Sequence, residues 1–106
     1  MKNGKVTIAT KSFETPVMVE VNCKVELKGD LCIHRPLERD DYGRWIESNR
    51  YWNITSPNGF EILRTSKIYT ARFKASQLLA LNINWTDKDS SNFYEKFKHE
   101  IFSIRD

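Results

Sequence analysis

Apolar residues recur at every second position over eleven consecutive residues, 17–27, and this alternation constrains the fold more than any other sequence feature. The odd-numbered members are all apolar: Val17, Val19, Val21, Cys23, Val25 and Leu27. The residues between them are Met18, Glu20, Asn22, Lys24 and Glu26. Successive side chains of a strand point to opposite faces, so a period of two predicts a strand with one buried face. We therefore predict a half-buried antiparallel strand here, straight or bent.

The turn residues Lys28–Asp30 follow and predict a hairpin. The return segment keeps the apolar pattern at Leu31, Ile33 and Leu37. If Leu27 pairs with Leu31, through a three-residue loop or a bulge, the apolar residues of both strands share one face. A two-residue loop would instead set Leu27 opposite Cys32, and the two apolar faces would disagree. The alternation alone leaves both registers open.

The remaining strands are shorter and are separated by turn residues. Alternation over residues 5–8 predicts a first strand, which Thr15-Pro16 ends. Residues 36–43 are charged and rich in turn formers, so we expect a surface loop. Residues 50–63 predict a second hairpin, because Ser56-Pro57-Asn58-Gly59 at its centre is a strong turn sequence.

The last forty residues have helical rather than strand periodicity. We predict a first helix over about residues 66–81, capped by Thr65 or Ser66 and ended by Asn82. Its apolar face is Ile68, Ala71, Ala75, Leu78 and Leu79. A second helix is predicted over about residues 87–104, with the Thr86 hydroxyl as its cap. Its apolar stripe is Phe93, Phe97, Ile101 and Ile104.

These elements predict a single α+β domain over residues 1–106. An antiparallel sheet of four to five strands, over about residues 5–63, precedes two helices that pack on one of its faces. We expect the odd-numbered face of residues 17–27 to meet the stripe of Phe93 and Phe97 across this interface.

No motif for catalysis, metal binding or phosphate binding stands out, and we expect neither enzyme activity nor a cofactor. Asp30, Cys32 and His34 would share one strand face, but side chains two apart diverge and no nucleophile motif surrounds them. The thiols of Cys23 and Cys32 are assigned to opposite faces, so they would not share a metal ion with a histidine. The sequence has neither the acid–acid–lysine spacing of a nuclease nor the clustered glycines of a phosphate-binding loop.

The clearest candidate for binding is a segment in which arginines alternate with aromatic residues. The chain carries a net charge of +3, and the excess lies in residues 35–74, where six of eight cations are arginine. Arginine, tryptophan and tyrosine dominate binding hot spots. The candidate partner-binding residues are Arg35, Arg39, Tyr42, Arg44, Trp45, Arg50 and Tyr51. In the alternative interpretation, Trp45 and Trp52 are core residues of a small domain.

Two functional hypotheses follow. The first is a non-enzymatic module that binds another protein, because acidic residues among the arginines would repel phosphates. The second is nucleic-acid binding, with bases stacked on Tyr51 and phosphates held by Lys67, Arg72 and Lys74. No apolar run is long enough to span a membrane. Two cysteines without an apolar leader lead us to expect a reducing cytoplasmic location, and an edge strand leaves a homodimer open.

Overall fold

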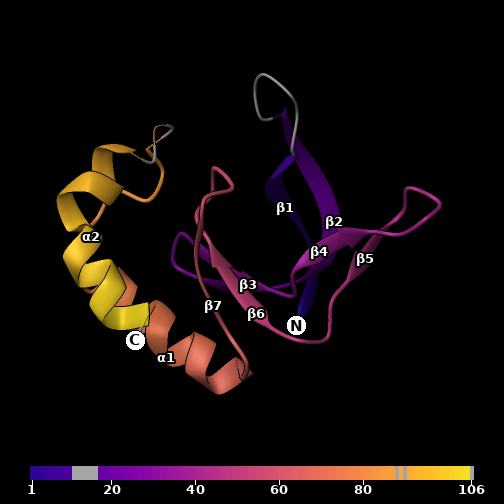
Figure 1. The fold of residues 1–106 in the computed structure, drawn as a ribbon. Helices are drawn as coiled ribbons and strands as arrows, with labels where there is room; N and C mark the ends of the chain where they lie inside the picture. Colours follow the sequence, from indigo (N-terminus) through magenta and orange to yellow (C-terminus); the bar gives the residue numbers. More distant parts are fainter. Residues whose placement is uncertain (11–16, 88, 90, 106) are drawn as a thin grey trace.

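A computed structural model describes residues 1–10, 17–87, 89 and 91–105, and Figure 1 shows its arrangement. The expected turn at Thr15-Pro16, and Lys88 near the second helix, lie outside these residues. The elements in chain order are β1 Lys2–Thr10, β2 Val17–Lys28, β3 Leu31–His34, β4 Leu37–Arg39, β5 Trp45–Glu47, β6 Trp52–Thr55, β7 Glu61–Thr65, α1 Ile68–Leu79 and α2 Ser91–Arg105.

The predicted α+β fold class is confirmed. Five strands form one antiparallel sheet in the order β1-β2-β3-β6-β7, and α1 and α2 follow in sequence and pack against it. In Figure 1 the two helices lie together at the left, while the β4–β5 hairpin extends on the other side of the sheet. The helix-covered side and the hairpin side are therefore separate surfaces.

The β2–β3 hairpin adopts the register with the two-residue loop. Lys28 pairs with Leu31 and Leu27 pairs with Cys32, so only Gly29 and Asp30 connect the strands. Gly29 has φ of +56°, a left-handed value that glycine adopts without the steric cost of a Cβ. Because directly paired residues share a face, Leu31 lies on the side opposite the odd-numbered residues of β2.

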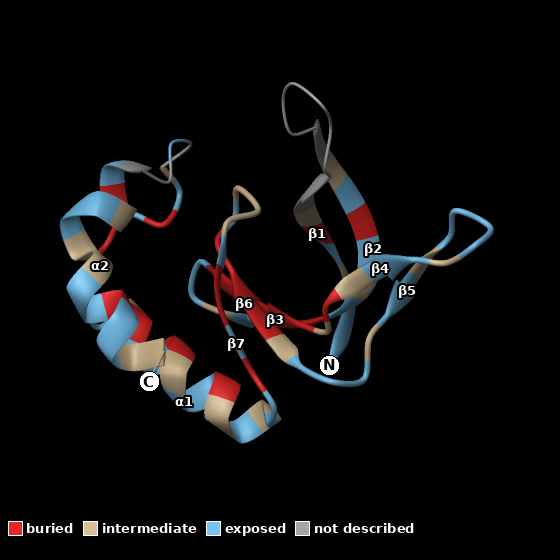
Figure 2. Cartoon of the chain, viewed as in Figure 1, coloured by how far each residue is buried: buried red, intermediate tan, exposed pale blue. Residues whose placement is uncertain are grey.

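This register divides the apolar residues into two clusters. The larger lies between the sheet and the helices: Leu31, Ile33, Ile54, Ile62, Leu63, Ala71, Ala75, Leu78, Ile83, Trp85, Phe93 and Ile101. The smaller joins Val6, Val25 and Cys32, with Cys23 and Leu37 against them. The expectation that the odd-numbered face of β2 meets the Phe93 and Phe97 stripe is therefore wrong. Figure 2 shows the buried segments of β3, β6 and β7 facing the helices.

Both helices bury the predicted stripes, but their first turns differ from the predictions. Lys67 is the N-cap of α1 and no side chain caps that helix, while the Thr65 hydroxyl donates to the Lys67 carbonyl at 2.9 Å. The second helix begins at Ser91, and the Thr86 hydroxyl instead donates to Asn84 Oδ1 at 2.6 Å. The predicted caps are wrong because each hydroxyl bonds within its own turn, a competition typical of Ser and Thr. Asn82 lies just beyond α1 with φ of +59°.

The register predicts that truncating Leu31 lowers the free energy of unfolding much more than truncating Leu27. Leu31 has no exposed surface, whereas Leu27 is 68% exposed. We expect Leu31→Ala to lower the free energy of unfolding by about 2–5 kcal/mol, because it leaves a cavity under the helices. Leu27→Ala should change it by less than about 0.5 kcal/mol. Urea titration of both variants measures this, and equal losses would contradict the two-residue loop.

Candidate functional site

Residues 37–47 form a two-stranded hairpin, β4 and β5, that we call the arm. Leu37 pairs with Glu47, Glu38 with Ile46, and Arg39 with Trp45. The surface loop predicted over residues 36–43 is confirmed for the turn at residues 40–43, but it misses strand β4, because a three-residue strand is too short to display a period.

The Asp40 carboxylate builds the turn of the arm. Its Oδ1 atom accepts the backbone N–H groups of Tyr42 and Arg44 at 2.9 and 2.8 Å. The Asp40 and Gly43 backbone N–H groups donate to Arg44 and Asp40 carbonyls at 2.9 and 3.0 Å, with Gly43 at φ of +77°. These bonds hold the pKa of Asp40 below its ordinary value, chiefly through the Arg44 backbone N–H. Asp40 thus acts as a turn residue by accepting the backbone N–H two residues ahead.

The arm is attached to the sheet at the point where β3 separates from β2. Val25 is the last β2 residue that pairs with β3, and the next N–H along the strand, that of Lys24, donates to Glu47 Oε1 at 3.0 Å. The Ser48 N–H donates to the Pro36 carbonyl at 2.8 Å, which closes the base of the arm. Leu37 packs on the smaller cluster. The bond to the Glu47 side chain and the apolar contact of Leu37 therefore fix the arm against β2.

Guanidinium groups stack on aromatic rings along the arm and the neighbouring strands. The distances from guanidinium carbon to ring centroid range from 3.9 to 5.5 Å. The pairs, which together we call the arginine–aromatic surface, are Arg35 on Trp52, Arg39 on Trp45, Arg44 on Tyr42, and Arg64 on Tyr51. All the predicted partner-binding residues except Arg50 belong to one of these pairs; two pairs lie on the arm, and two lie at the start of β6, where Trp52 packs against the larger cluster on the helix side.

The aromatic residues of this surface differ in burial. Tyr42 is 84% exposed at the tip of the arm, and Tyr51 and Ile46 are also exposed. Trp52 is half-buried and packs against the larger cluster, as the core alternative requires. Trp45 is half-buried on the arm, under the Arg39 side chain. The exposed rings are thus at the arm's tip and at the start of β6.

Only part of the positive charge of this surface is neutralised internally. Arg44 Nε pairs with Asp40 at 2.9 Å, and Arg64 Nε pairs with Glu61 at 2.8 Å. Arg35 instead donates to the Tyr51 carbonyl at 3.3 Å. Within the described part of the chain, Arg39 makes no ion pair, and neither does Arg50, which lies outside the four pairs. The Arg39 guanidinium therefore remains available to a partner.

The sequence left open whether Trp52 is a core or a surface residue, and it did not single out Arg64 for binding. Arg64 pairs with Asn53 across β6–β7, which places it beside Tyr51. The predicted hairpin of residues 50–63 could have indicated this pairing, had its register been known.

Two of the three cations of the nucleic-acid hypothesis already bind other groups of the chain. Arg72 makes a two-pronged ion pair with Glu26, at 2.7 and 2.9 Å. Lys74 Nζ donates to the Arg105 carbonyl at 2.8 Å, which links α1 to α2. Lys67 is exposed at the start of α1. They lie on the helix-covered side, away from the arm.

Burial suppresses the reactivity of both thiols. Burial raises the pKa of Cys32 to about 12 and that of Cys23 to about 11. The two thiols lie in the same small cluster, so their assignment to opposite faces is wrong and follows from the wrong register. A thiol with such a pKa stays protonated near neutral pH and is a poor nucleophile. Among the described residues, no three His, Cys, Asp or Glu groups are placed to bind a metal ion.

His34 belongs to a row of buried polar side chains that the sequence did not reveal. It faces Asn53 across β3–β6, and Thr55 faces Cys32 beside them. His34 Nδ1 lies 2.7 Å from the Arg35 carbonyl, whereas His34 Nε2, Asn53 Oδ1 and Thr55 Oγ1 have no partner among the described residues. Burial lowers the pKa of His34, and nearby Glu61 and Glu47 oppose this only in part. The imidazole is therefore neutral at the base of the arm.

Comparison with protein-family models, with curated proteins and with solved structures finds no match for the chain. Neither helix in the described residues has the length and apolarity needed to cross a membrane.

The buried imidazole predicts a loss of stability in acid. Because the pKa of His34 is lower in the folded than in the unfolded chain, the unfolded chain binds a proton first as the pH falls below about 6.5. We expect the free energy of unfolding to fall with decreasing pH from that point, by at most about 1.4 kcal/mol per pH unit from this group.

Urea titrations between pH 7.5 and 5.5 measure this slope. The His34→Gln variant should have a shallower slope than the unchanged chain. The matched control is His99→Gln, because His99 is exposed, and it should retain the full slope. Equal slopes in all three proteins would show that His34 does not titrate with folding.

Proposed function

We propose that the chain is a small protein-binding module that acts by contact rather than by catalysis. The observation that carries the proposal is the set of four guanidinium–ring pairs on the arm and the adjoining strands, together with a Tyr42 ring that is 84% exposed at the tip of the arm. Arginine and aromatic residues are the side chains that contribute most to binding hot spots.

Stacking prepares these side chains for binding. A free arginine side chain loses about 2 kcal/mol of conformational entropy when it is fixed in one rotamer. The rings of Trp52 and Trp45 already restrict Arg35 and Arg39, with centroids 3.9 and 4.8 Å from the guanidinium carbons. Part of the entropic cost of ordering the interface is therefore met within the free protein.

Mixed charge on the arm favours a protein partner over nucleic acid. Glu38 and Asp41 are exposed on the same hairpin as Arg39 and Arg44. Carboxylates at these positions repel phosphates, whereas a protein surface can offer charges of both signs. The ion pair of Arg72 with Glu26 also reduces the charge available to a phosphate backbone.

The two free thiols fit a reducing compartment, so we place the protein in the cytoplasm as part of this proposal. Self-association is a further outcome, because β1 and β7 are outer strands of the sheet. The experiment below detects it as capture of an untagged second copy.

Removing exposed arm side chains should abolish capture of the partner. We expect the double variant Arg39→Ala, Tyr42→Ala to lose at least about tenfold in captured partner, because it removes hot-spot residues. The measurement is a quantitative pull-down with tagged protein from native lysate, with and without nuclease. The matched control is Tyr69→Ala, Phe73→Ala, which removes two rings of α1 that are 68% and 66% exposed.

Three outcomes separate the hypotheses. A nuclease-resistant protein that the arm variant loses and the α1 variant keeps supports the proposal. Capture that survives in the arm variant contradicts it. Partners that vanish after nuclease, with affinity that falls about one log unit per log unit of salt for each phosphate contacted, would favour nucleic-acid binding instead.

A further inference from the structure

The outer face of α1 carries two aromatic rings where the exposed face of a helix ordinarily carries polar side chains. Tyr69 and Phe73 lie one turn apart and are 68% and 66% exposed. The buried residues of α1 lie on the other face. At 3.6 residues per turn, the face opposite to them consists of four exposed, uncharged residues, which we call the outer strip: Tyr69, Phe73, Ser76 and Ala80.

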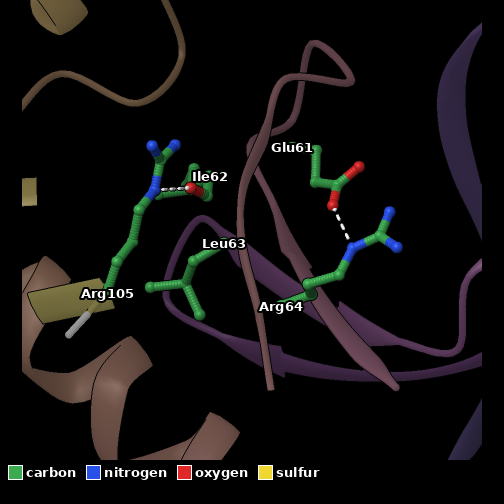
Figure 3. Close-up of a pocket in the computed structure, with 5 residues that line it drawn as sticks. All are labelled: Glu61, Ile62, Leu63, Arg64 and Arg105. Carbon is green, nitrogen blue, oxygen red and sulfur yellow. Dashed lines mark hydrogen bonds and ion pairs between the residues drawn. The ribbon is translucent and has the colours of Figure 1, made fainter. Parts of the chain in front are cut away.

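Bonds on both flanks hold α1 in place and engage the cations beside the outer strip. On one flank, the Arg72 guanidinium pairs with the Glu26 carboxylate at 2.7 and 2.9 Å. On the other flank, Lys74 Nζ donates to the Arg105 carbonyl at 2.8 Å. Arg105 Nε in turn donates to the Ile62 carbonyl at 2.7 Å, as Figure 3 shows. The outer strip is therefore presented by a fixed helix.

The shape of the outer strip is complementary to a second copy of itself. Its large side chains lie toward the start of α1 and its small ones toward the end. In an antiparallel pair of α1 helices, with the two-fold axis between Lys74 and Ala75, Tyr69 of each copy faces Ala80 of the other. Phe73 of each copy likewise faces Ser76 of the other. Rings thus pack over small residues at four places, which lets the two helices approach closely.

The charges near α1 also favour an antiparallel second copy. Lys67 is exposed at the start of α1, whose first turn has no acidic residue and whose last turn has no basic one. The dipole of α1 is therefore uncompensated at both ends. In the antiparallel pair, Lys67 of each copy lies near Asn82, at the negative end of α1 of the other copy. Arg72 faces the neutral Gln77, so no cation of α1 opposes another.

We propose that two copies of the chain associate through their outer strips, as an antiparallel two-fold pair of α1 helices. An aromatic side chain buries about 150–250 Å², so the two rings of each copy offer roughly 200–330 Å². A standard interface buries about 800 Å² per partner, so this dimer dissociates readily on dilution. The arm lies on the other side of the sheet (Figure 1) and stays exposed, so the inference does not rest on the proposed function.

Sedimentation equilibrium of the whole chain tests the dimer. Between about 5 and about 500 µM, the range suited to an interface of this size, the apparent mass should rise from that of one chain toward that of two. Phe73→Glu places a carboxylate against the partner copy and should raise the dissociation constant at least about tenfold. Its urea midpoint should be unchanged, because Phe73 is exposed. Tyr42→Ala, which removes an exposed ring of the arm, is the matched control and should dimerise normally.

A mixture of two variants tests the register of the pair. Phe73→Glu and Ser76→Lys should each dimerise poorly alone, because each places two unpaired charges in the interface. An equimolar mixture should regain dimer, because the new carboxylate of one copy faces the new ammonium of the other. The second contact of that mixed pair keeps the original Phe73 against the original Ser76.

Three results would overturn the inference. The first is the mass of a single chain over the whole concentration range. The second is a dimer that persists in Phe73→Glu, which would assign association to another surface such as a sheet edge. The third is a mixture that dimerises no better than either variant alone. None of these measurements involves the partner of the arm, so the dimer and the proposed function can fail independently.

Discussion

The pairing of β2 with β3 through the two-residue loop at Gly29 and Asp30 decides which side chains the helices cover. Directly paired residues share a face, so the loop length alone assigns Leu31 and Ile33 to the helix side and Cys32 and His34 to the other. A three-residue loop would exchange these assignments. The composition of the larger cluster depends on this two-residue loop. The surface against which α1 and α2 pack therefore depends on it as well.

The same pairing also creates the place where the arm attaches. Four residues of β3 pair with β2, and the chain then turns away at Arg35 and Pro36. The next N–H of β2, at Lys24, is left for the Glu47 side chain to bind. A carboxylate thus continues the hydrogen bonding of the strand edge where the backbone of β3 stops. Arg35, which stacks on Trp52, leaves β3 at this junction.

The types of most elements could be predicted from the sequence. An apolar periodicity that continues over many residues is seldom overridden by contacts elsewhere in the fold. The alternation of residues 17–27 and the stripe of Phe93, Phe97, Ile101 and Ile104 both correspond to observed elements. The periodicity of two strands does not reveal the length of the loop between them, here Gly29 and Asp30. For this reason the face of Cys32 was predicted wrongly.

The candidate surface was predicted in composition but not in geometry. Residue types alone indicated Arg39, Tyr42 and Trp45, because hot-spot side chains were concentrated there. Which ring each guanidinium covers depends on strands of three residues and on a turn built by the Asp40 side chain. Arg64 joins them from a strand fourteen positions beyond Arg50, a proximity that only the sheet order creates.

Strand β2, at twelve residues, extends beyond the layer that the helices cover. Its first part pairs only with β1, and the described residues of that region contribute Val6 and Val21 to the interior. Fewer apolar contacts lower the free energy of local opening. We therefore expect backbone amides of β1 to exchange with solvent through opening events that leave β3, β6 and β7 intact, which makes the N-terminal hairpin a separate cooperative unit.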